Sequence, residues 1–278
     1  MSFRNNMLSE NLESIISQLE DLTLSLFPEI LKIYEDKNFK TTHKADGSPL
    51  TKADMLAHKL ILRFLNKNYP DIPVVSEESF VQKGYKPAKE FWIVDPIDGT
   101  KEFVNRSGEF TTNIALIQNG QPILGVVGAP TLNKIWSGIA TQATLSKPSK
   151  KTILNPKLKI VMSKSHQTVI DTAFLSYLDK NNVKISTISK GSSLKICVLA
   201  DKKADIYPRF GPTLEWDIAA ADAVLRAKGG GIFLIDSFEP LEYGKKDSIL
   251  NPMFIAISDL NQKQRILSLI RGFSKNLL

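Results

Sequence analysis

The segment that most constrains the fold is WIVDPIDGT, residues 92–100, in which an apolar run ends at two aspartates three positions apart. The run predicts a buried strand, and the proline after Asp95 keeps that aspartate extended. Because the chain must then turn sharply, Asp95, the carbonyl of Ile97 and Asp98 can converge on one point. Hard oxygen ligands gathered in this way suit Mg²⁺, although the same letters also fit an ordinary surface turn. The two residues that follow can aim backbone N–H groups at an anion if a helix begins there.

Three further acidic sites stand where strands are expected to end or helices to begin. Glu77 and Glu78 follow a short apolar strand, Asp217 begins an Ala-rich helix, and Asp54 begins another. Each also fits a structural role: a solvated turn for the glutamates, a dipole partner for Asp217, and a capping box for Asp54 with Thr51. One shared metal site explains all of them together. A cation site beside an anion site predicts metal-assisted phosphate chemistry.

Hydrophobic spacing predicts two parts: residues 1–150, with two helices and a mostly antiparallel sheet, and residues 151–278, in which strands and helices alternate. The boundary is expected in a polar, basic segment from about residue 145 to 157. The expected helices are 8–34 (with a break near Pro28), 51–68, 168–180, 193–200, 217–227 and 261–271. The expected strands are 73–76, 91–94, 112–117, 123–129, 135–138, 159–162, 183–188, 204–207, 232–235 and 254–258.

The bulk properties favour a cytoplasmic globular protein. The 278 residues are 42% hydrophobic and 23% charged, with no apolar run of membrane-spanning length and no apolar signal segment at the start. Cys197 is the single cysteine, which excludes an internal disulfide, and its apolar surroundings predict a core residue rather than a nucleophile.

The net charge of +7 raises the question of whether the protein has an anionic partner. No basic patch with interleaved aromatic residues is visible, which argues against a nucleic-acid polymer, and the dense basic spot at 147–151 is expected to be a linker or hairpin. A basic envelope around an acidic pocket would steer small polyanions inward. Peripheral contact with the inner face of a membrane and a homodimer are both left open.

Three motifs together resemble the signature of the inositol monophosphatase superfamily, whose members are Mg²⁺-dependent, lithium-sensitive phosphomonoesterases. The motifs are Ser76-Glu77-Glu78, the segment 92–100, and Trp216-Asp217-Ile218-Ala219-Ala220. The resemblance runs roughly from residue 44 to 255 and implies a layered αβαβα sandwich, α+β in its first half and α/β in its second. Further segments resemble the bacterial CysQ-type branch, the 3′(2′),5′-bisphosphate nucleotidases: Lys101-Glu102-Phe103, 108–117, 163–166, 191–195 and 207–213.

The resemblance also implies roles for the acidic residues. Glu77, Asp95 and the Ile97 carbonyl would hold a first Mg²⁺, and Asp95, Asp98 and Asp217 a second, so that Asp95 bridges the two. A third, weaker ion would depend on Glu77 and water.

The resemblance assigns the water and the phosphate as well. Thr100 with Asp54 would orient and deprotonate the attacking water, with Glu77 counted among the catalytic groups. The N–H groups of Gly99 and Thr100 would hold the scissile phosphate, and Asp217 would also touch the substrate.

On the nucleotide side, the resemblance implies phosphate contacts from Ser192, Lys195 and Arg209, and a place for His166 against the base or ribose. Without the resemblance, Gly191-Ser192-Ser193 fits a helix cap and Lys195 a solvated lysine. One departure stands out, because Ala221-Asp222 occupies the place of the family's usual Gly and frequent His. Asp222 would alter nucleotide affinity if it pointed into the pocket and would do nothing if it pointed outward.

The leading hypothesis is a nucleotidase that hydrolyses adenosine 3′,5′-bisphosphate, with activity on the 5′-phosphosulfate analogue left open. An inositol or sugar monophosphatase is the alternative, but it would not explain Lys101-Glu102-Phe103, Lys195 and Arg209. A non-catalytic Mg²⁺ or nucleotide sensor would be expected to lack a metal ligand, and all of them are present. RNA binding would show as a steep salt dependence.

Overall fold

The computed structural model describes residues 2–36, 41–43, 49–140, 157–165 and 167–274. His166, the basic spot at 147–151 and nearly all of the expected boundary segment lie outside the described residues. None of the described helices combines the length and the apolar character that crossing a membrane requires.

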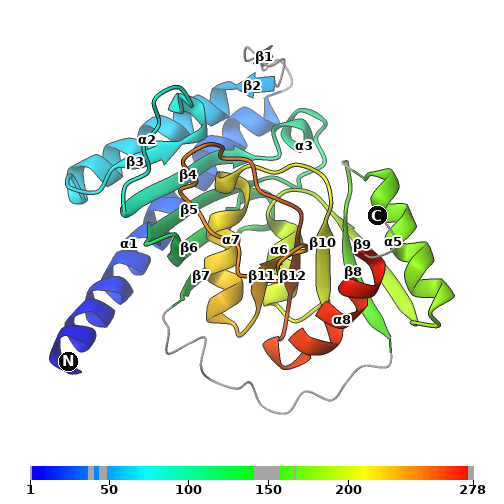
Figure 1. Cartoon of the computed structure of the whole chain (residues 1–278). Helices are drawn as coiled ribbons and strands as arrows, with labels where there is room; N and C mark the ends of the chain where they lie inside the picture. The colour runs from blue at the N-terminus through cyan, green and yellow to red at the C-terminus, as the bar shows by residue number, and fades with distance from the viewer. Residues whose placement is uncertain (1, 37–40, 44–48, 141–156, 166, 275–278) are drawn as a thin grey trace.

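The elements stack as five alternating layers, which confirms the predicted αβαβα sandwich (Figure 1). The outer layer on one side holds α1 (Ser2–Glu35) and α2 (Lys52–Asn68), packed on the first five-stranded sheet. Helices α6 (Leu194–Ala200) and α7 (Glu215–Ala227) fill the middle layer. The second five-stranded sheet follows, and α5 (Val169–Lys180) and α8 (Lys263–Ser274) cover its far face.

The first sheet has the order β3-β4-β5-β6-β7. Its strands are β3 (Val74–Ser76), β4 (Glu90–Asp98), β5 (Thr111–Gln118), β6 (Gln121–Ala129) and β7 (Lys134–Ile139). Only β3 runs parallel to its neighbour β4, and the other pairs are antiparallel. The register of β4 against β5 shifts between Asp95 and Asp98, so the chain bulges where the two aspartates stand.

The second sheet has the order β11-β12-β10-β8-β9 and mixes both directions. Its strands are β8 (Leu158–Ser163), β9 (Ile185–Lys190), β10 (Ile206–Arg209), β11 (Gly231–Leu234) and β12 (Phe254–Ile257). Strand β8 pairs in parallel with both β9 and β10, as expected for strands joined by helices, and β12 is antiparallel to β10 and β11.

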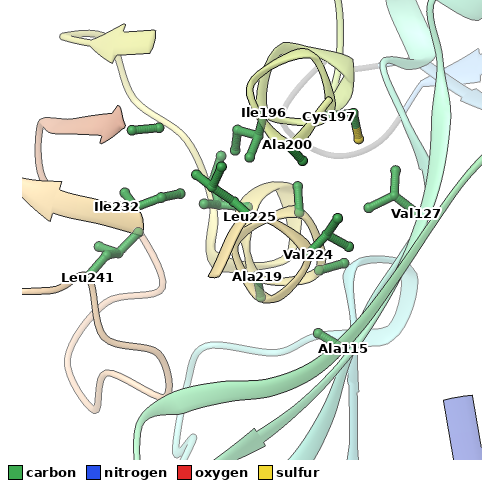
Figure 2. Close-up of a cluster of buried hydrophobic side chains, with 14 of the residues drawn as sticks. Ala115, Val127, Ile196, Cys197, Ala200, Ala219, Val224, Leu225, Ile232 and Leu241 are labelled. Carbon is green, nitrogen blue, oxygen red and sulfur yellow. The ribbon is translucent and has the colours of Figure 1, made fainter. Parts of the chain in front are cut away.

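Helix α7 belongs to the second half of the chain but packs on the first sheet. A side chain on Gly125 of β6 would collide with the Ala220 carbonyl, and one on Gly138 of β7 with the Ala227 methyl. The sheet therefore leaves room for the helix backbone itself. Figure 2 shows this contact, with Ala219 and Val224 of α7 between the sheet residue Ala115 and the side chains of α6. Cys197 lies buried in the same cluster, so the prediction of a core cysteine is confirmed.

Three sequence predictions of secondary structure need correction. Helix α1 continues through Pro28, because Leu26, Phe27 and Ile30 on both sides of the proline are buried and hold the helix in line. Strands β9 and β10 begin two residues later than expected. The short hairpin of β1 (Thr41–His43) and β2 (Pro49–Thr51) was not predicted. The division into parts at residue 150 stays a prediction.

Asp222 points neither into the pocket nor outward, so both sequence-based alternatives are wrong. It is fully buried, and its carboxylate accepts hydrogen bonds from Arg226 Nε at 2.9 Å and from the Tyr243 hydroxyl at 2.9 Å. Arg226 completes the ion pair at 2.8 Å and also donates to the Leu241 carbonyl at 3.1 Å. The departure from the family pattern is thus a buried network that ties α7 to the segment after β11.

Candidate active site

Three aspartates that are far apart in the sequence meet at one point. Asp95 and Asp98 come from the end of β4, and Asp217 comes from the first turn of α7. One carboxylate oxygen from each lies within 4.8 Å of the others. Asp95 is buried, and its Oδ1 has no hydrogen-bond partner within the described parts of the chain. A buried carboxylate oxygen without a partner, beside two more carboxylates, is the donor set of a divalent cation site.

The electrostatics of the cluster support the same assignment. Burial raises the pKa of Asp95 well above its usual value, and the nearby carboxylates of Glu77 and Asp98 raise it further. Burial likewise raises the pKa of Asp217, with Asp98 adding to it. Such repulsion is relieved when a cation sits among the carboxylates. The residues present therefore fit a metal ion, and Glu77 stands next to Asp95 on the cavity wall.

Two serines hold Asp98 in place. Asp98 Oδ2 accepts hydrogen bonds from Ser192 Oγ at 2.8 Å, from the Ser193 N–H at 2.7 Å and from Ser193 Oγ at 2.9 Å. Ser193 Oγ also contacts the Asp217 carbonyl at 2.8 Å. Ser193 occupies the cap position of α6, as the helix-cap interpretation expects, but its hydroxyl makes no side-chain cap bond and contacts Asp98 instead. No pattern in the sequence assigned Ser193 to the site.

Asp54 serves the helix and the site at once. Its Oδ2 accepts from the Thr51 N–H at 2.8 Å and Thr51 Oγ1 at 2.5 Å, which forms the predicted capping box of α2. Its other oxygen accepts from Thr100 Oγ1 at 3.2 Å, and the same hydroxyl lies 3.2 Å from the Ile97 carbonyl. Burial raises the pKa of Asp54 above its usual value. The capping role and the proposed role in the site are therefore compatible for Asp54, because each uses a different carboxylate oxygen.

Gly99 is required by the turn that follows the aspartates. Its φ of +88° is in the left-handed region, and helix α3 (Thr100–Val104) begins at the next residue. A Cβ on Gly99 would lie 3.2 Å from the Glu109 carbonyl and 3.3 Å from Ser192 Cβ. Both the backbone angle and the crowded surroundings therefore favour glycine.

A cavity of about 500 Å³ opens beside the carboxylates. Its lining includes Lys195, Arg209 and Ser192, together with Asp98, Gly99, Thr100, Glu77 and Asp217. Lys195 Nζ donates to the Ser192 carbonyl at 2.6 Å and lies 5.8 Å from the centre of the Tyr207 ring. Arg209 Nη2 donates to the Pro212 carbonyl at 2.7 Å. The structure thus places eight of the predicted site residues on the cavity wall. Asp95, Asp54 and Ile97 do not line the cavity but contact residues that do, through the aspartate cluster and the Thr100 hydroxyl.

Glu102 lines the cavity, although the sequence pointed to it only as part of a motif and not to a separate role. It is buried, and it accepts a hydrogen bond from Ser165 Oγ at 2.6 Å. That bond ties α3 to the segment after β8, beside the cavity. Glu102 thus adds a carboxylate to a cavity wall that also carries Lys101, Lys195 and Arg209, and a carboxylate is a hydrogen-bond acceptor.

The comparisons with known proteins agree with this geometry. The profile of the inositol monophosphatase family matches residues 11–270. The 3′(2′),5′-bisphosphate nucleotidase CysQ of Escherichia coli K12 is 40% identical over 249 residues, covering 86% of this chain and 98% of that protein. The corresponding nucleotidase of Haemophilus influenzae is 32% identical and covers 82% of this chain and 87% of its own length.

Solved structures give the same result. The crystal structure of CysQ from Bacteroides thetaiotaomicron, described as a bacterial member of the inositol monophosphatase family, has a TM-score of 0.74 and 37% identity. The alignment covers 88% of this chain and 97% of that one. The Thermotoga maritima inositol monophosphatase TM1415 has a TM-score of 0.70 at 20% identity, covering 97% and 100%, and so supports the fold alone.

Proposed function

Because the chain belongs to the inositol monophosphatase family, we propose that it is a phosphomonoesterase of the 3′(2′),5′-bisphosphate nucleotidase type. Its substrate would be adenosine 3′,5′-bisphosphate, which it hydrolyses to AMP and phosphate. The observation that carries this proposal is the cluster of Asp95, Asp98 and Asp217 beside a cavity that also presents Lys195 and Arg209. The metal site would bind one phosphate and the two cationic side chains would bind a second. This arrangement suits a substrate with two phosphates.

The residues that would hold the metal are Glu77, Asp95, the Ile97 carbonyl, Asp98 and Asp217, enough for two to three Mg²⁺ ions. When bound, Mg²⁺ supplies positive charge that makes water a better nucleophile and stabilises the departing oxygen. The carboxylate cluster is compatible with metal dependence of this kind.

The chain's own groups would orient the water and the phosphate. Thr100 Oγ1 donates to Asp54 at 3.2 Å, so a lone pair of the hydroxyl is left to accept a proton from the attacking water. Asp54 would take up the proton that Thr100 passes on, and burial raises its pKa, which favours proton uptake. The backbone N–H groups of Gly99 and Thr100, at the start of α3, would bind the scissile phosphate. The Ser192 hydroxyl donates a hydrogen bond to Asp98. Ser192 would therefore help to position that carboxylate as well as line the cavity.

The test is phosphate release with Mg²⁺ from a panel of substrates under identical conditions. The panel contains adenosine 3′,5′-bisphosphate, its 5′-phosphosulfate analogue, inositol 1-phosphate and fructose 1,6-bisphosphate. We expect kcat/KM to be highest for one of the two adenosine compounds. A higher value for either sugar phosphate would overturn the proposal and favour the sugar monophosphatase alternative.

Lys195→Ala is expected to raise KM for adenosine 3′,5′-bisphosphate by about 10- to 100-fold with a smaller change in kcat. The reason is that a cationic donor in the cavity, rather than a ligand of the metal, is lost. Steady-state kinetics at saturating Mg²⁺ measure both constants. Lys203→Ala is the matched control, since Lys203 is an exposed lysine outside the cavity that pairs with Asp201 at 3.2 Å. An unchanged KM in Lys195→Ala would remove this lysine from the substrate site.

We also propose that the enzyme works in the cytoplasm on a small nucleotide, since a chain with a single, buried cysteine has no disulfide framework and fits a reducing compartment. Association with a membrane surface and a homodimer stay predictions.

A further inference from the structure

A buried histidine outside the cavity touches the segment that carries Glu77. His58 is 8% exposed and stands one helical turn after Asp54 on α2. Its Nδ1 lies 2.9 Å from Ser76 Oγ, and the two groups share a hydrogen bond. Ser76 is 1% exposed and is the last residue of β3, directly before Glu77. His58 and Ser76 are both absent from the cavity lining.

The hydroxyl of Ser76 is used for this contact and not for a local one. Ser76 is the cap residue of the 3₁₀ turn Glu77–Ser79, where a serine side chain commonly accepts a hydrogen bond from the turn. Here its side chain makes no such bond. The hydroxyl instead reaches α2, so the turn that carries Glu77 is anchored to a neighbouring helix.

This anchor joins two parts of the site that approach from different elements. Helix α2 holds Asp54, which contacts Thr100 at 3.2 Å. Strand β3 is paired in parallel with β4, with Ser76 opposite Val94, so the turn after it begins alongside Asp95. The His58–Ser76 bond therefore connects the base Asp54 with the carboxylate Glu77 through one turn of helix.

We propose that His58 is a positioning residue that fixes Glu77 relative to Asp54 by way of Ser76. This inference rests on the proposed metal-dependent function. A group behind a metal ligand commonly sets the affinity of the site, and its loss costs about 10- to 100-fold in metal affinity or activity. The competing explanation is that His58 only satisfies a buried hydroxyl and contributes to stability.

The experiment is a double-mutant cycle with His58→Ala, Ser76→Ala and the double variant, in the full chain. Mg²⁺ affinity is measured by calorimetry on metal-free protein, and kcat and KM are measured separately. We expect each single variant to weaken Mg²⁺ binding by about 10-fold and to lower kcat, with KM for the nucleotide unchanged. The double variant is expected to be no worse than either single one, because both remove the same bond.

A conservative variant and a matched control complete the design. His58→Asn should restore most of the affinity, since its amide places a polar atom as many bonds from Cα as imidazole Nδ1. Thr23→Val removes a buried hydroxyl that donates to the Leu19 carbonyl at 2.7 Å on α1, away from the cavity. It should leave Mg²⁺ affinity and kcat unchanged even if it lowers the unfolding midpoint.

The outcomes separate this inference from the proposed function. Losses of Mg²⁺ affinity that add in the double variant, or single variants that bind Mg²⁺ like the wild type, overturn the positioning role. A wild-type protein that binds Mg²⁺ but releases no phosphate from adenosine 3′,5′-bisphosphate overturns the function, and the calorimetric cycle still decides the role of His58. If His58→Ala does not fold, Ser76→Ala and His58→Asn carry the same comparison.

Discussion

Asp98→Asn is expected to lower kcat for adenosine 3′,5′-bisphosphate by about 1000-fold or more, which corresponds to about 4 kcal/mol of lost transition-state stabilisation. The substitution removes one negative charge from a cluster in which three carboxylates lie within 4.8 Å of one another. A neutral amide oxygen is a much weaker ligand for Mg²⁺ than a carboxylate. Calorimetric Mg²⁺ binding should weaken together with kcat.

The fold of the Asp98→Asn variant should be retained. The side-chain oxygen of asparagine can still accept the bonds from the Ser193 N–H and the two serine hydroxyls, which lie at 2.7 to 2.9 Å. In EDTA the variant should unfold at a temperature no lower than the wild type, because repulsion with Asp95 and Asp217 is reduced. Added Mg²⁺ should raise the unfolding midpoint of the wild type by mass action and that of the variant much less. Near-normal turnover in this variant would refute the metal assignment.

Asp222→Ala is expected to lower the free energy of unfolding by about 3–5 kcal/mol, measured by urea denaturation. Asp222 is fully buried and Arg226 is 4% exposed, so the substitution leaves a guanidinium inside the protein without its counter-ion. The Tyr243 hydroxyl loses its acceptor as well. Because the pair lies in the middle layer rather than in the cavity, Mg²⁺ affinity of the folded variant should be unchanged.

A second variant separates the cost of an unpaired charge from the cost of an altered core. Replacing both partners, as Asp222→Leu with Arg226→Met, should destabilise less than Asp222→Ala, since no buried charge is left alone. The outcome that contradicts this account is a loss below about 1 kcal/mol for Asp222→Ala, well under the range for a broken buried pair.

The family resemblance implied the layers, which the structure confirms, and the candidate metal ligands, whose role stays a proposal; both rest on short motifs that can be recognised locally. An apolar run before Asp95 and a helix beginning at Asp217 can each be recognised within about ten residues. The partners of these residues could not be predicted in this way. Ser193 reaches Asp98 across 95 positions, and His58 reaches Ser76 across 18. Such contacts depend on how α6 and α2 pack in the folded protein. The spacing of residues within a short segment of the sequence does not predict that packing.

The prediction for Asp222 failed for the same reason. The sequence left two orientations of the Asp222 side chain open, toward the pocket or toward water. In the structure the side chain points to neither and is buried inside the protein. Its partner Tyr243 comes from a segment 21 residues later, after β11. Whether a charged residue on a helix is exposed or paired inside the protein depends on what packs against that helix.

Helix α7 lies against the two glycines of the first sheet while it carries Asp217 toward the end of β4. The cluster of Asp95, Asp98 and Asp217 therefore forms only when α7, from the second half of the chain, has docked on the first sheet. A partly folded molecule in which α7 has not docked on the first sheet holds two of the three aspartates together at most. If the cluster is the metal site proposed above, turnover by this protein also reports that α7 has docked on the first sheet.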